Sequence, residues 1–268
     1  MAWLSLTKAP WVAIRLHLPP PKAASPEGRP RGGDRRCLEG ILCILWTGAP
    51  WSALPRRDGS PSTCWRRLKQ WEEIGVLLKR WRAFLAQLND QQKLRWDECF
   101  ADGRFIPVKR GGQSRQDEAR QAHEVNGAGR WCRDSAGSIP GRGNPGGGTC
   151  LETHLGTVAV GRPGKPSWSR KRPKRLIVDR GYDSNPLPAR LTRQGIEPII
   201  PARATHKRRT HQDGRKLPRY RWRWIVERTF AWLGHFRRLV VRYVRLIKTY
   251  AGFFHLTCAI LTMPKVSK

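Results

Sequence analysis

Acidic residues are scarce in this sequence. Only 20 of its 268 residues are Asp or Glu, against 52 Lys and Arg, so the formal net charge is +32. A positive field of this size attracts polyanions, which makes nucleic acid the first partner to consider, ahead of a membrane surface. Charge does not distinguish DNA from RNA, so a basic RNA-associated protein stays open at this stage.

Long apolar runs are also missing. No stretch of 18 apolar residues occurs, and we therefore expect no membrane span. Residues 1–22 lack the basic start, long apolar core and small-residue cleavage site of a signal peptide, which favours a cytoplasmic protein.

The common metal-binding and nucleotide-binding patterns are absent as well. The seven cysteines form no CxxC pair and no Cys/His cluster, which argues against a zinc site or a disulfide framework and favours reduced thiols. The histidines are scattered without ligand spacing, so we interpret them as core or incidental residues. Residues 141–148 are rich in glycine, but no Lys-Ser or Lys-Thr pair follows them, which argues against a phosphate-binding loop.

Three regions can be distinguished along the chain. Residues 1–33 run into a basic Pro/Gly-rich stretch, which predicts a flexible arm or linker. Residues 34–93 carry apolar side chains at helical spacing, which predicts a helical domain. Residues 94–262 alternate strand and helix patterns, which predicts an α/β domain. Inside this last region, residues 113–150 are rich in Arg, Gly and Ser and keep neither a helical nor an alternating period.

Capping residues mark the helix boundaries of the helical region. Asp34 is the expected N-cap of a first helix, which Gly48 ends. A second helical segment begins at Ser60 or Ser62 and is interrupted at Gly75. The region is therefore predicted to be an arrangement of helix, turn and helix.

Segments of strand length characterise the α/β region. An alternation around Phe100 predicts a strand or hairpin within residues 94–112. A helical pattern runs from about residue 219 to 248, and an apolar helix at 250–261 closes the region. Two further strands are predicted at 175–179 and 197–202, with a helix between them at 185–195.

Two aspartates stand at or in predicted strands. Asp179 directly follows an apolar run, and functional groups in open α/β sheets gather at the carboxyl ends of strands because side chains there face the crevice. The alternative is that Asp179 is an N-cap or turn residue. Asp102 interrupts an otherwise apolar alternation, although the Asp-Gly pair that it begins is also a common turn signal.

Glu227 is the only acidic residue from position 214 to the end of the sequence. It borders an apolar helical stripe that contains Val226 and Phe230, so we expect its carboxylate to be half-buried. Tyr220 and Arg223 precede it by seven and four residues and share its helical face. The alternative is a simple helix pair between Arg223 and Glu227, which contributes only about 0.3–0.5 kcal/mol when exposed.

If the three carboxylates converge, their mutual repulsion is costly unless a cation bridges them. Oxygen ligands of this kind favour Mg²⁺ or Mn²⁺ over zinc. Two such ions would activate a nucleophilic oxygen and stabilise the leaving oxygen of a phosphodiester displacement, and nearby Lys and Arg would hold the DNA backbone. Trp222, Trp224 and Trp232 could stack on bases, but their helical spacing is more typical of core residues.

Five segments resemble the transposases of the insertion sequence 5 family of bacterial mobile elements. The resemblance covers about residues 34–112 and 151–262. It implies DDE-type enzymes with a ribonuclease H-like catalytic core at 94–262, preceded by a helical DNA-binding domain at 34–93. The segments are "LEGILCILWTGAPWSALP", "GSPSTCWRRLKQWEE", "DGRFIPVKRGG", "RLIVDRGYDS" and "RWIVERTFAWLGHFRRLVVRY".

The resemblance also implies roles for individual residues. The three acids of such enzymes fall on Asp102, Asp179 and Glu227, as catalytic residues and metal ligands. A Tyr-x2-Arg-x3-Glu signature of related elements is matched by Tyr220, Arg223 and Glu227. The basic residue expected seven positions after the glutamate is Gly234 here, so that role passes to Arg237 or Arg238. DNA contacts are expected at Tyr220, Arg223, Lys207, Arg208 and Arg237.

The implied activity is metal-dependent cleavage at the ends of an insertion element, followed by transfer of the cut strand to target DNA. The implied cofactor is Mg²⁺ or Mn²⁺, bound as two ions. The implied partners are the double-stranded terminal repeats and target DNA, with a homodimer formed on DNA and no membrane partner. The expected location is the bacterial cytoplasm, at the nucleoid.

Residues 113–150 depart from the family pattern, in which two apolar strands lie between the first and second aspartates. A sequence of this composition is what a shifted reading frame of GC-rich DNA produces. We therefore interpret it as a compensated frameshift in a decayed element. A genuine flexible insertion is the alternative. Loss of the two strands would displace Asp102 from Asp179, whereas catalysis needs placement to about half an ångström. Two functions stay open: an active transposase, or a catalytically inactive DNA-binding remnant that occupies element ends.

Overall fold

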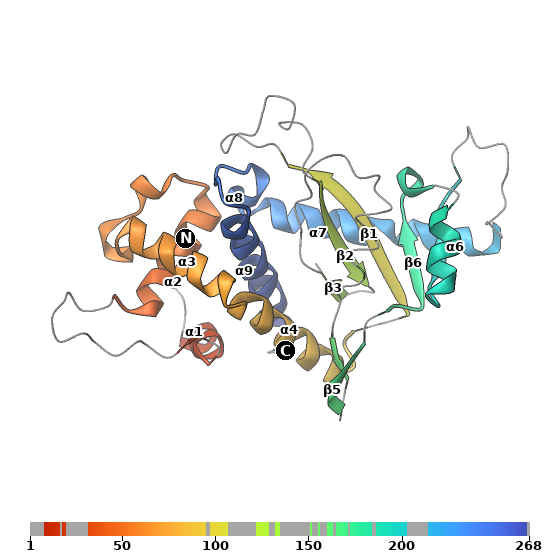
Figure 1. Cartoon of the computed structure of the whole chain (residues 1–268), viewed down its shortest axis with the longest axis horizontal. Helices are drawn as coiled ribbons and strands as arrows, with labels where there is room; N and C mark the ends of the chain where they lie inside the picture. The colour runs from red at the N-terminus through yellow and green to blue at the C-terminus, as the bar shows by residue number, and fades with distance from the viewer. Residues whose placement is uncertain are drawn as a thin grey trace. The chain divides into compact units, whose positions relative to one another are not determined.

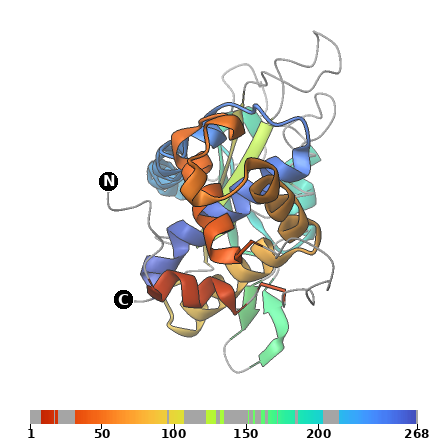
Figure 2. The same ribbon diagram turned by 90° about the vertical axis from the view of Figure 1, so that its left-hand side faces the viewer.

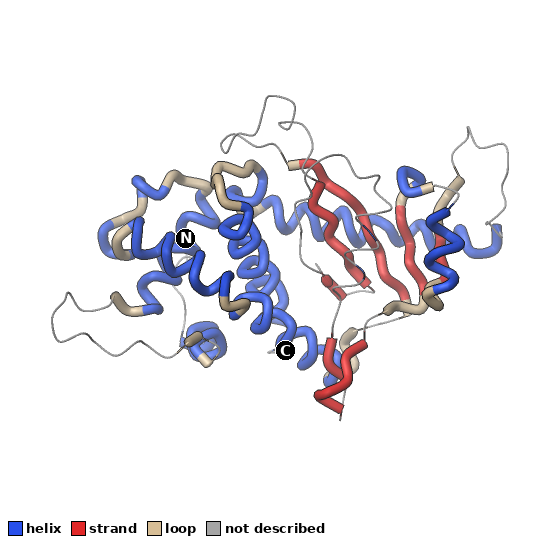
Figure 3. Tube along the Cα trace, in the orientation of Figure 1, coloured by secondary structure: helices blue, strands red, loops and turns tan. Residues whose placement is uncertain are grey.

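A computed structural model of the chain describes residues 8–16, 18–19, 32–94, 97–106, 122–128, 132–134, 151, 155, 160–162, 165–170, 172–183, 186–202 and 214–266. The chain forms two compact units (Figures 1 and 3). The first contains Met1–Trp81, Lys109–Gly111 and Leu233–Lys268, and the second contains Arg82–Val108 and Gly112–Trp232. The first is helical in its described part, and the second carries the sheet.

Helices from both ends of the chain make up the first unit. Figure 2 shows the chain turned by 90° from the view of Figure 1. Short 3₁₀ turns at Trp51–Ala53 and Arg56–Asp58 connect two of these helices. Among the described residues, no helix is long and apolar enough to cross a bilayer. The helices are α1 (Lys8–Arg15), α2 (Asp34–Thr47), α3 (Pro61–Glu73), the start of α4 (Val76–Asp90), α8 (Arg237–Val240) and α9 (Ile247–Val266).

The predicted boundaries of α2, α3 and α4 are largely confirmed. Gly48 adopts a φ of 71° after α2, and Gly75 adopts a φ of 69° between α3 and α4. These are left-handed values that glycine adopts without steric cost. Ser60 precedes α3 as its N-cap, with Pro61 in the first turn. Asp34 is the first residue of α2 rather than its cap, and its carboxylate lies 3.1 Å from Nε of Arg67.

The C-terminal helix α9 packs against α3. The backbones approach closely at Gly252, where a Cβ atom would lie 3.0 Å from Cδ1 of Leu68. His255 places Nδ1 2.9 Å from Oε1 of Glu72, and both side chains are largely buried.

The predicted domain limits of 34–93 and 94–262 stay a prediction. The structure adds that the segment from Leu233 onward belongs to the same compact unit as the N-terminal helices.

The expectation of a flexible arm at residues 1–33 stays a prediction; within this segment, Lys8–Arg15 form α1, with Ile14 buried. One expectation about the helices is wrong. The single helix expected at about 219–248 is divided into a 3₁₀ segment at Gly214–Arg223, α7 (Trp224–Gly234) and α8. Pro218 lies in the first piece and lacks the amide donor of a regular helix.

The break after α7 also has a tertiary cause. Arg238 in α8 is buried, and its Nη1 lies 3.3 Å from the carbonyl oxygens of both Gly48 and Ala49. Phe236, between α7 and α8, packs edge-on against Trp46, with 5.3 Å between the ring centroids. These contacts hold α8 against the end of α2.

A five-stranded mixed sheet forms the second unit, in the order β3-β2-β1-β6-β7 (Figure 1). β1, β6 and β7 are parallel, whereas β2 is antiparallel to β1 and to β3. α6 (Pro186–Arg193) connects β6 to β7, and a separate hairpin is formed by β4 (Val160–Arg162) and β5 (Lys165–Arg170). The sheet strands are β1 (Glu98–Phe105), β2 (Ala122–Ala128), β3 (Cys132–Asp134), β6 (Arg175–Val178) and β7 (Glu197–Ile199). The predicted α/β class is confirmed.

The strands β2 and β3 lie inside the segment that was expected to have lost its central strands. Asp102 of β1 pairs with Val125 of β2, and Gly127 of β2 pairs with Arg133 of β3. The expectation of disrupted central strands is therefore not met at 122–128 and 132–134. Backbone hydrogen bonds to a neighbouring strand can form without a clear side-chain alternation, which is why the pattern missed these strands.

Buried apolar residues from the sheet and from α7 form the core of the second unit. Phe100, Ile177 and Ile199 come from three adjacent strands, and Val226 comes from α7. Tyr220 packs against this cluster. The apolar side of α7 thus fixes the helix on the sheet beside the ends of β1 and β6.

Substitution of Gly40 by alanine should destabilise the first unit. A Cβ atom at Gly40 would lie 2.8 Å from the backbone oxygen of Asp58 and 3.0 Å from Sγ of Cys64. We expect a loss of about 1–3 kcal/mol in the free energy of unfolding, because the backbone oxygen cannot move freely. Urea unfolding followed by circular dichroism measures this loss.

The matched control is Gly234→Ala. Among the described residues, nothing lies within 4 Å of a Cβ atom at this position. We expect unchanged stability or a gain of about 0.4–1 kcal/mol. Equal unfolding midpoints for the two variants would contradict the close approach at Gly40.

Candidate active site

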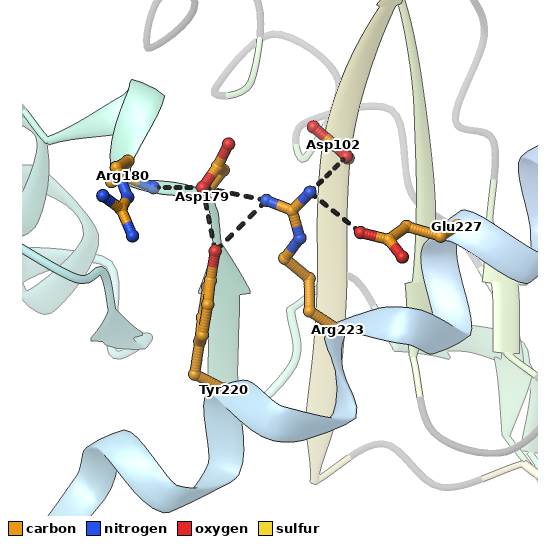
Figure 4. A network of polar contacts seen from close by, with 6 residues as sticks. All are labelled: Asp102, Asp179, Arg180, Tyr220, Arg223 and Glu227. Atoms are coloured by element: carbon orange, nitrogen blue, oxygen red, sulfur yellow. Dashed lines mark hydrogen bonds and ion pairs between the residues drawn. The ribbon is translucent and has the colours of Figure 1, made fainter.

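The three predicted acids come together in the second unit (Figure 4). Ala101 of β1 pairs with Val178 of β6 in the parallel register, so Asp102 and Asp179 are the next residues on adjacent strands. Glu227 lies in the first turn of α7, which Val226 anchors to the core. Two strands and one helix therefore present a carboxylate each to one region.

The guanidinium of Arg223 lies between these carboxylates. Its Nη1 is 2.8 Å from Oδ1 of Asp179. Its Nη2 is 3.4 Å from Oδ2 of Asp102 and 3.2 Å from Oε1 of Glu227. Only 19% of the Arg223 side chain is exposed, so one largely buried cation contacts the acids of three elements and balances one of their three charges.

Asp179 is the most strongly bound of the three acids. Its Oδ1 accepts hydrogen bonds from the amide of Arg180 at 2.7 Å, the hydroxyl of Tyr220 at 2.8 Å, and Nη1 of Arg223. The bond from Arg180 makes Asp179 the N-cap of the 3₁₀ turn Arg180–Tyr182. The capping interpretation and the placement among the acids are thus both correct.

These contacts shift the pKa values of the groups involved. Burial, the largest influence, would raise the pKa of Asp179, but hydrogen bonds from Tyr220, Arg223 and Arg180 outweigh it and lower that pKa below its ordinary 3.8. Burial would lower the pKa of Arg223, but the Asp179 and Asp102 carboxylates outweigh it and raise that pKa. Burial, followed by the bond to Asp179, raises the pKa of Tyr220. Asp179 and Arg223 are therefore held ionised.

The exposure of several residues differs from the sequence-based expectation. Glu227 was expected to be half-buried, but 59% of its side chain is exposed, because Val226 takes the buried position beside it. The core interpretation of Trp222 and Trp224 is also wrong, since they are 41% and 45% exposed. Trp232 is half-buried.

The remaining basic candidates are distributed as follows. Lys207 and Arg208 lie outside the described residues. Arg237 is exposed on α8, in the first compact unit, whereas Arg238 is buried against Gly48. Arg238 therefore has a structural role, and Arg237 stays the candidate for the DNA contact.

Several ion pairs were not predicted, and they link the starts of β1, β6 and β7 with one another and with the 3₁₀ segment before α7. Arg219 binds Glu98 at the start of β1. Arg175 of β6 lies 2.9 Å from Glu197 of β7 and 3.8 Å from Glu98. These pairs join residues about 20 to 120 positions apart, so no local pattern signals them.

The three acids are of the ligand type that divalent cations prefer, but among the described residues their spacing is not that of a metal site. Carboxylate oxygens are the ligands that Mg²⁺ and Mn²⁺ prefer, and the three acids already surround one positive group. Within the described ranges, no three His, Cys, Asp or Glu side chains are close enough together to hold a metal. The guanidinium of Arg223 occupies the space between the acids, so an ion would take its place rather than join it.

Two family models match separate parts of the chain. Residues 6–81 match the family described as "Putative transposase of IS4/5 family", and residues 156–262 match the family described as "Transposase DDE domain". Asp179 and Glu227 fall inside the second match.

Two curated proteins from Burkholderia cepacia are similar to this chain. The "Putative transposase for insertion sequence element IS402" is 44% identical over 91 residues, which cover 34% of this chain and 39% of that protein. The "Insertion element IS402 uncharacterized 16.2 kDa protein" is 36% identical over 107 residues, which cover 38% of this chain and 73% of that protein. This chain thus spans less than half of the first relative's length. No solved structure matches the chain.

Removal of the Tyr220 hydroxyl should make the free energy of unfolding depend less strongly on pH in the acidic range. A lowered pKa of Asp179 stabilises the fold above its ordinary value of 3.8, and this stability is lost as pH falls through the lowered value. Tyr220→Phe removes one donor, so the pKa of Asp179 should rise toward 3.8. We expect Tyr220→Phe to be less stable than wild type at neutral pH by about 0.5–1 kcal/mol, the low end for a hydrogen bond to a partly exposed carboxylate.

Unfolding in denaturant between neutral and strongly acidic pH measures this difference, which should shrink below the ordinary pKa. Tyr243→Phe is the control, because Tyr243 is 40% exposed and lies in the first unit. A stability difference between wild type and Tyr220→Phe that stays constant across this pH range would contradict the assignment.

Proposed function

Because this chain belongs to the DDE transposases of IS4/5-type insertion elements, we propose that it cuts DNA at the ends of such an element and transfers the cut strands to target DNA. One observation carries the proposal. Asp102, Asp179 and Glu227 come from β1, the end of β6 and α7, and all contact the same cationic group. Acids so arranged in a chain of net charge +32 suit a metal site that acts on phosphates.

The sheet supports a ribonuclease H-like catalytic core as the finer description of the α/β fold. That core was expected to place two strands between the first and second acids, and β2 and β3 lie between Asp102 and Asp179 in the chain. The first acid lies on β1, which has a neighbour on each side. The second follows β6, the parallel neighbour of β1.

Each residue of the site has a distinct task in the proposed reaction. Asp102, Asp179 and Glu227 would hold Mg²⁺ or Mn²⁺, as two ions. When bound, these ions supply the activation of water and the stabilisation of the leaving oxygen in phosphodiester cleavage. Tyr220 fixes the orientation of Asp179 through its hydroxyl.

Arg223 would change partners during the cycle. Without an ion, its guanidinium contacts all three acids. Its planar fork also matches the oxygens of a phosphate, so a DNA phosphate can replace the carboxylates when an ion takes over their charge. The proposed DNA ligands are Arg223, Tyr220, Lys207, Arg208 and Arg237, on double-stranded element ends and target DNA, with a homodimer that brings two ends together.

A second function, an inactive DNA-binding remnant, is favoured by one observation. In the part of the chain that the structure describes, the acids are not close enough together to hold a metal. A chain fixed in this arrangement would bind element ends through its positive charge and cut nothing. Metal-dependent cleavage separates the two functions.

Cleavage should require the Asp179 carboxylate. We expect wild type to nick a DNA that carries the ends of its element in the presence of Mg²⁺ or Mn²⁺, and Asp179→Asn to lose at least about 100-fold in rate, since an amide is a poor ligand and cannot balance the ion's charge. Gel analysis of end-labelled DNA measures the rate.

Asp97→Asn is the matched control for the charge change. Asp97 is 57% exposed and pairs with Lys174 rather than with Arg223. It should nick DNA at the wild-type rate. If wild type cuts no more than Asp179→Asn while both bind the DNA, the remnant function is correct and the enzyme proposal fails.

Arg223 and a divalent ion should compete for the same acids in the protein alone. Arg223→Gln leaves three carboxylates without their cation, so without metal we expect it to be less stable by about 1–2 kcal/mol, a discounted value because Glu227 is exposed. Mn²⁺ should raise the melting temperature of this variant more than that of wild type, because it binds the folded state without displacing a guanidinium.

Arg219→Gln controls for loss of a nearby arginine, since Arg219 binds Glu98 rather than the three acids. Its response to Mn²⁺ should equal that of wild type. Equal Mn²⁺ shifts in wild type, Arg219→Gln and Arg223→Gln would contradict the competition.

A further inference from the structure

Two buried cysteines meet where α2 packs against α3. Cys37 lies in the first turn of α2, and Cys64 lies in the first turn of α3. Their residues are 2% and 0% exposed, and both are free thiols. Both belong to the first compact unit, so neither takes part in the candidate active site of the second. The sequence analysis interpreted them only as reduced thiols.

Two contacts between the helices bracket the thiols. Oδ1 of Asp34, one turn before Cys37, lies 3.1 Å from Nε of Arg67. One turn after Cys37, a Cβ atom at Gly40 would lie 3.0 Å from Sγ of Cys64. Residues three apart share a helix face, so Cys37 faces α3 between these two contacts. The thiols of Cys37 and Cys64 accordingly share a hydrogen bond.

The surroundings make the two thiols unequal. The hydrogen bond from Cys64 is the largest influence on Cys37, and with the charge and hydrogen bond of the buried Arg67 it outweighs burial and lowers the pKa of Cys37 from 9.0 to about 7. The start of a helix also favours a thiolate. The bond to Cys37, followed by burial, raises the pKa of Cys64. Cys37 therefore carries the thiolate, and Cys64 keeps its proton.

We propose that Cys37 and Cys64 form an oxidisable thiol pair, in which a peroxide attacks Cys37 and Cys64 then closes a disulfide between α2 and α3. A zinc site is a poorer match, because it needs four ligands and, among the described residues, no three His, Cys, Asp or Glu side chains gather. Both sulfurs are buried, so the oxidant must be as small as hydrogen peroxide. Access is easiest at Cys37, because the ends of helices fray.

The reaction consumes one peroxide and releases two waters. The Cys37 thiolate attacks one peroxide oxygen, the O–O bond breaks, and a sulfenic acid and a hydroxide ion form. The hydroxide takes the proton of Cys64. The new Cys64 thiolate attacks the sulfur of the sulfenic acid, the S–O bond breaks, and the second hydroxide takes a proton from solvent. The two sulfurs are oxidised by two electrons in total, which reduce the peroxide.

Peptide mapping of the full-length protein after treatment with hydrogen peroxide tests the proposal. A chelator is present, the remaining thiols are blocked in acidic denaturant, and the protein is digested with pepsin before mass spectrometry. We expect a linked pair of peptides that contain Cys37 and Cys64. The rate should rise with pH and reach half its maximum at a pH of about 7, where the thiolate of Cys37 is half formed.

At that pH the reaction should be about 5-fold faster than that of an ordinary thiol, because a larger thiolate fraction outweighs its lower nucleophilicity. Cys43 is the internal control, since it lies on α2 and burial raises its pKa. It should be recovered with the blocking group attached. The melting temperature of the oxidised protein should rise, because the cross-link restricts the unfolded chain.

Serine variants distinguish the roles of the two thiols. Cys64→Ser should stop at the sulfenic acid of Cys37, which dimedone labels, because a hydroxyl still donates to the thiolate but cannot form a disulfide. Cys37→Ser should give neither label nor cross-link. Cys43→Ser should form the disulfide at the wild-type rate. Equal melting temperatures of the reduced proteins show that each variant folds.

Three outcomes would overturn the thiol pair. These are the absence of a Cys37–Cys64 link in peroxide-treated wild type, a link that forms only after the protein is unfolded, and equal dimedone labelling of Cys64→Ser and Cys37→Ser. The first two need no variant, so a serine variant that misfolds leaves the proposal testable. Neither DNA nor a metal takes part, so the thiol pair and the proposed transposase activity can fail separately.

Discussion

The contact on which the candidate site depends is that of one guanidinium with three carboxylates. Arg223 reaches Asp179, Asp102 and Glu227 within 2.8–3.4 Å, although the acids belong to two strands and a helix. Three like charges in so small a space would repel one another and would each lose hydration. The cation lowers that cost by balancing one of the three charges, and it ties the 3₁₀ segment before α7 to β1 and to the end of β6. The same contact therefore stabilises the fold and holds the residues of the candidate site together.

Under the proposed function, the same arrangement would favour a divalent ion over the guanidinium. A guanidinium carries one positive charge spread over a plane, whereas a divalent ion carries two at a point, so the acids would attract the ion more strongly. Arg223 would then be left with an unpaired charge. A phosphate satisfies that charge with two parallel hydrogen bonds. Binding of an ion and binding of a DNA phosphate would therefore support each other.

Local patterns predicted most of the elements around the site. α2, α3, β1, β6, α6 and β7 could be found because apolar spacing, capping residues and glycines act within a few residues. The division of the chain after α7 could not, since it depends on the bonds of Arg238 to carbonyls 190 and 189 positions away. The strands β2 and β3 escaped notice because their residues carry no clear alternation.

The candidate site, too, was predicted only in those features that local sequence patterns indicate. The three acids were singled out from their place beside strands, from their scarcity in a basic chain and from a family resemblance. The central place of Arg223 was not predicted, because spacing along a helix indicates only its contact with Glu227, four residues on. Its contacts to Asp102 and Asp179 arise from the packing of α7 on the sheet, which no local pattern contains.

The three acids differ in how firmly they are held, and this suggests an order of events. Asp102 lies within β1, pairs with Val125 of β2 and is 19% exposed, and Asp179 is fixed by a backbone amide and a tyrosine. Glu227 has a longer side chain, is 59% exposed and is bound only by Arg223 among the contacts described above. The two aspartates thus form a fixed pair, and Glu227 is the acid that can move at least cost. Under the proposed function, Asp102 and Asp179 would hold an ion with fixed side chains, and Glu227 would be the ligand that adjusts its position.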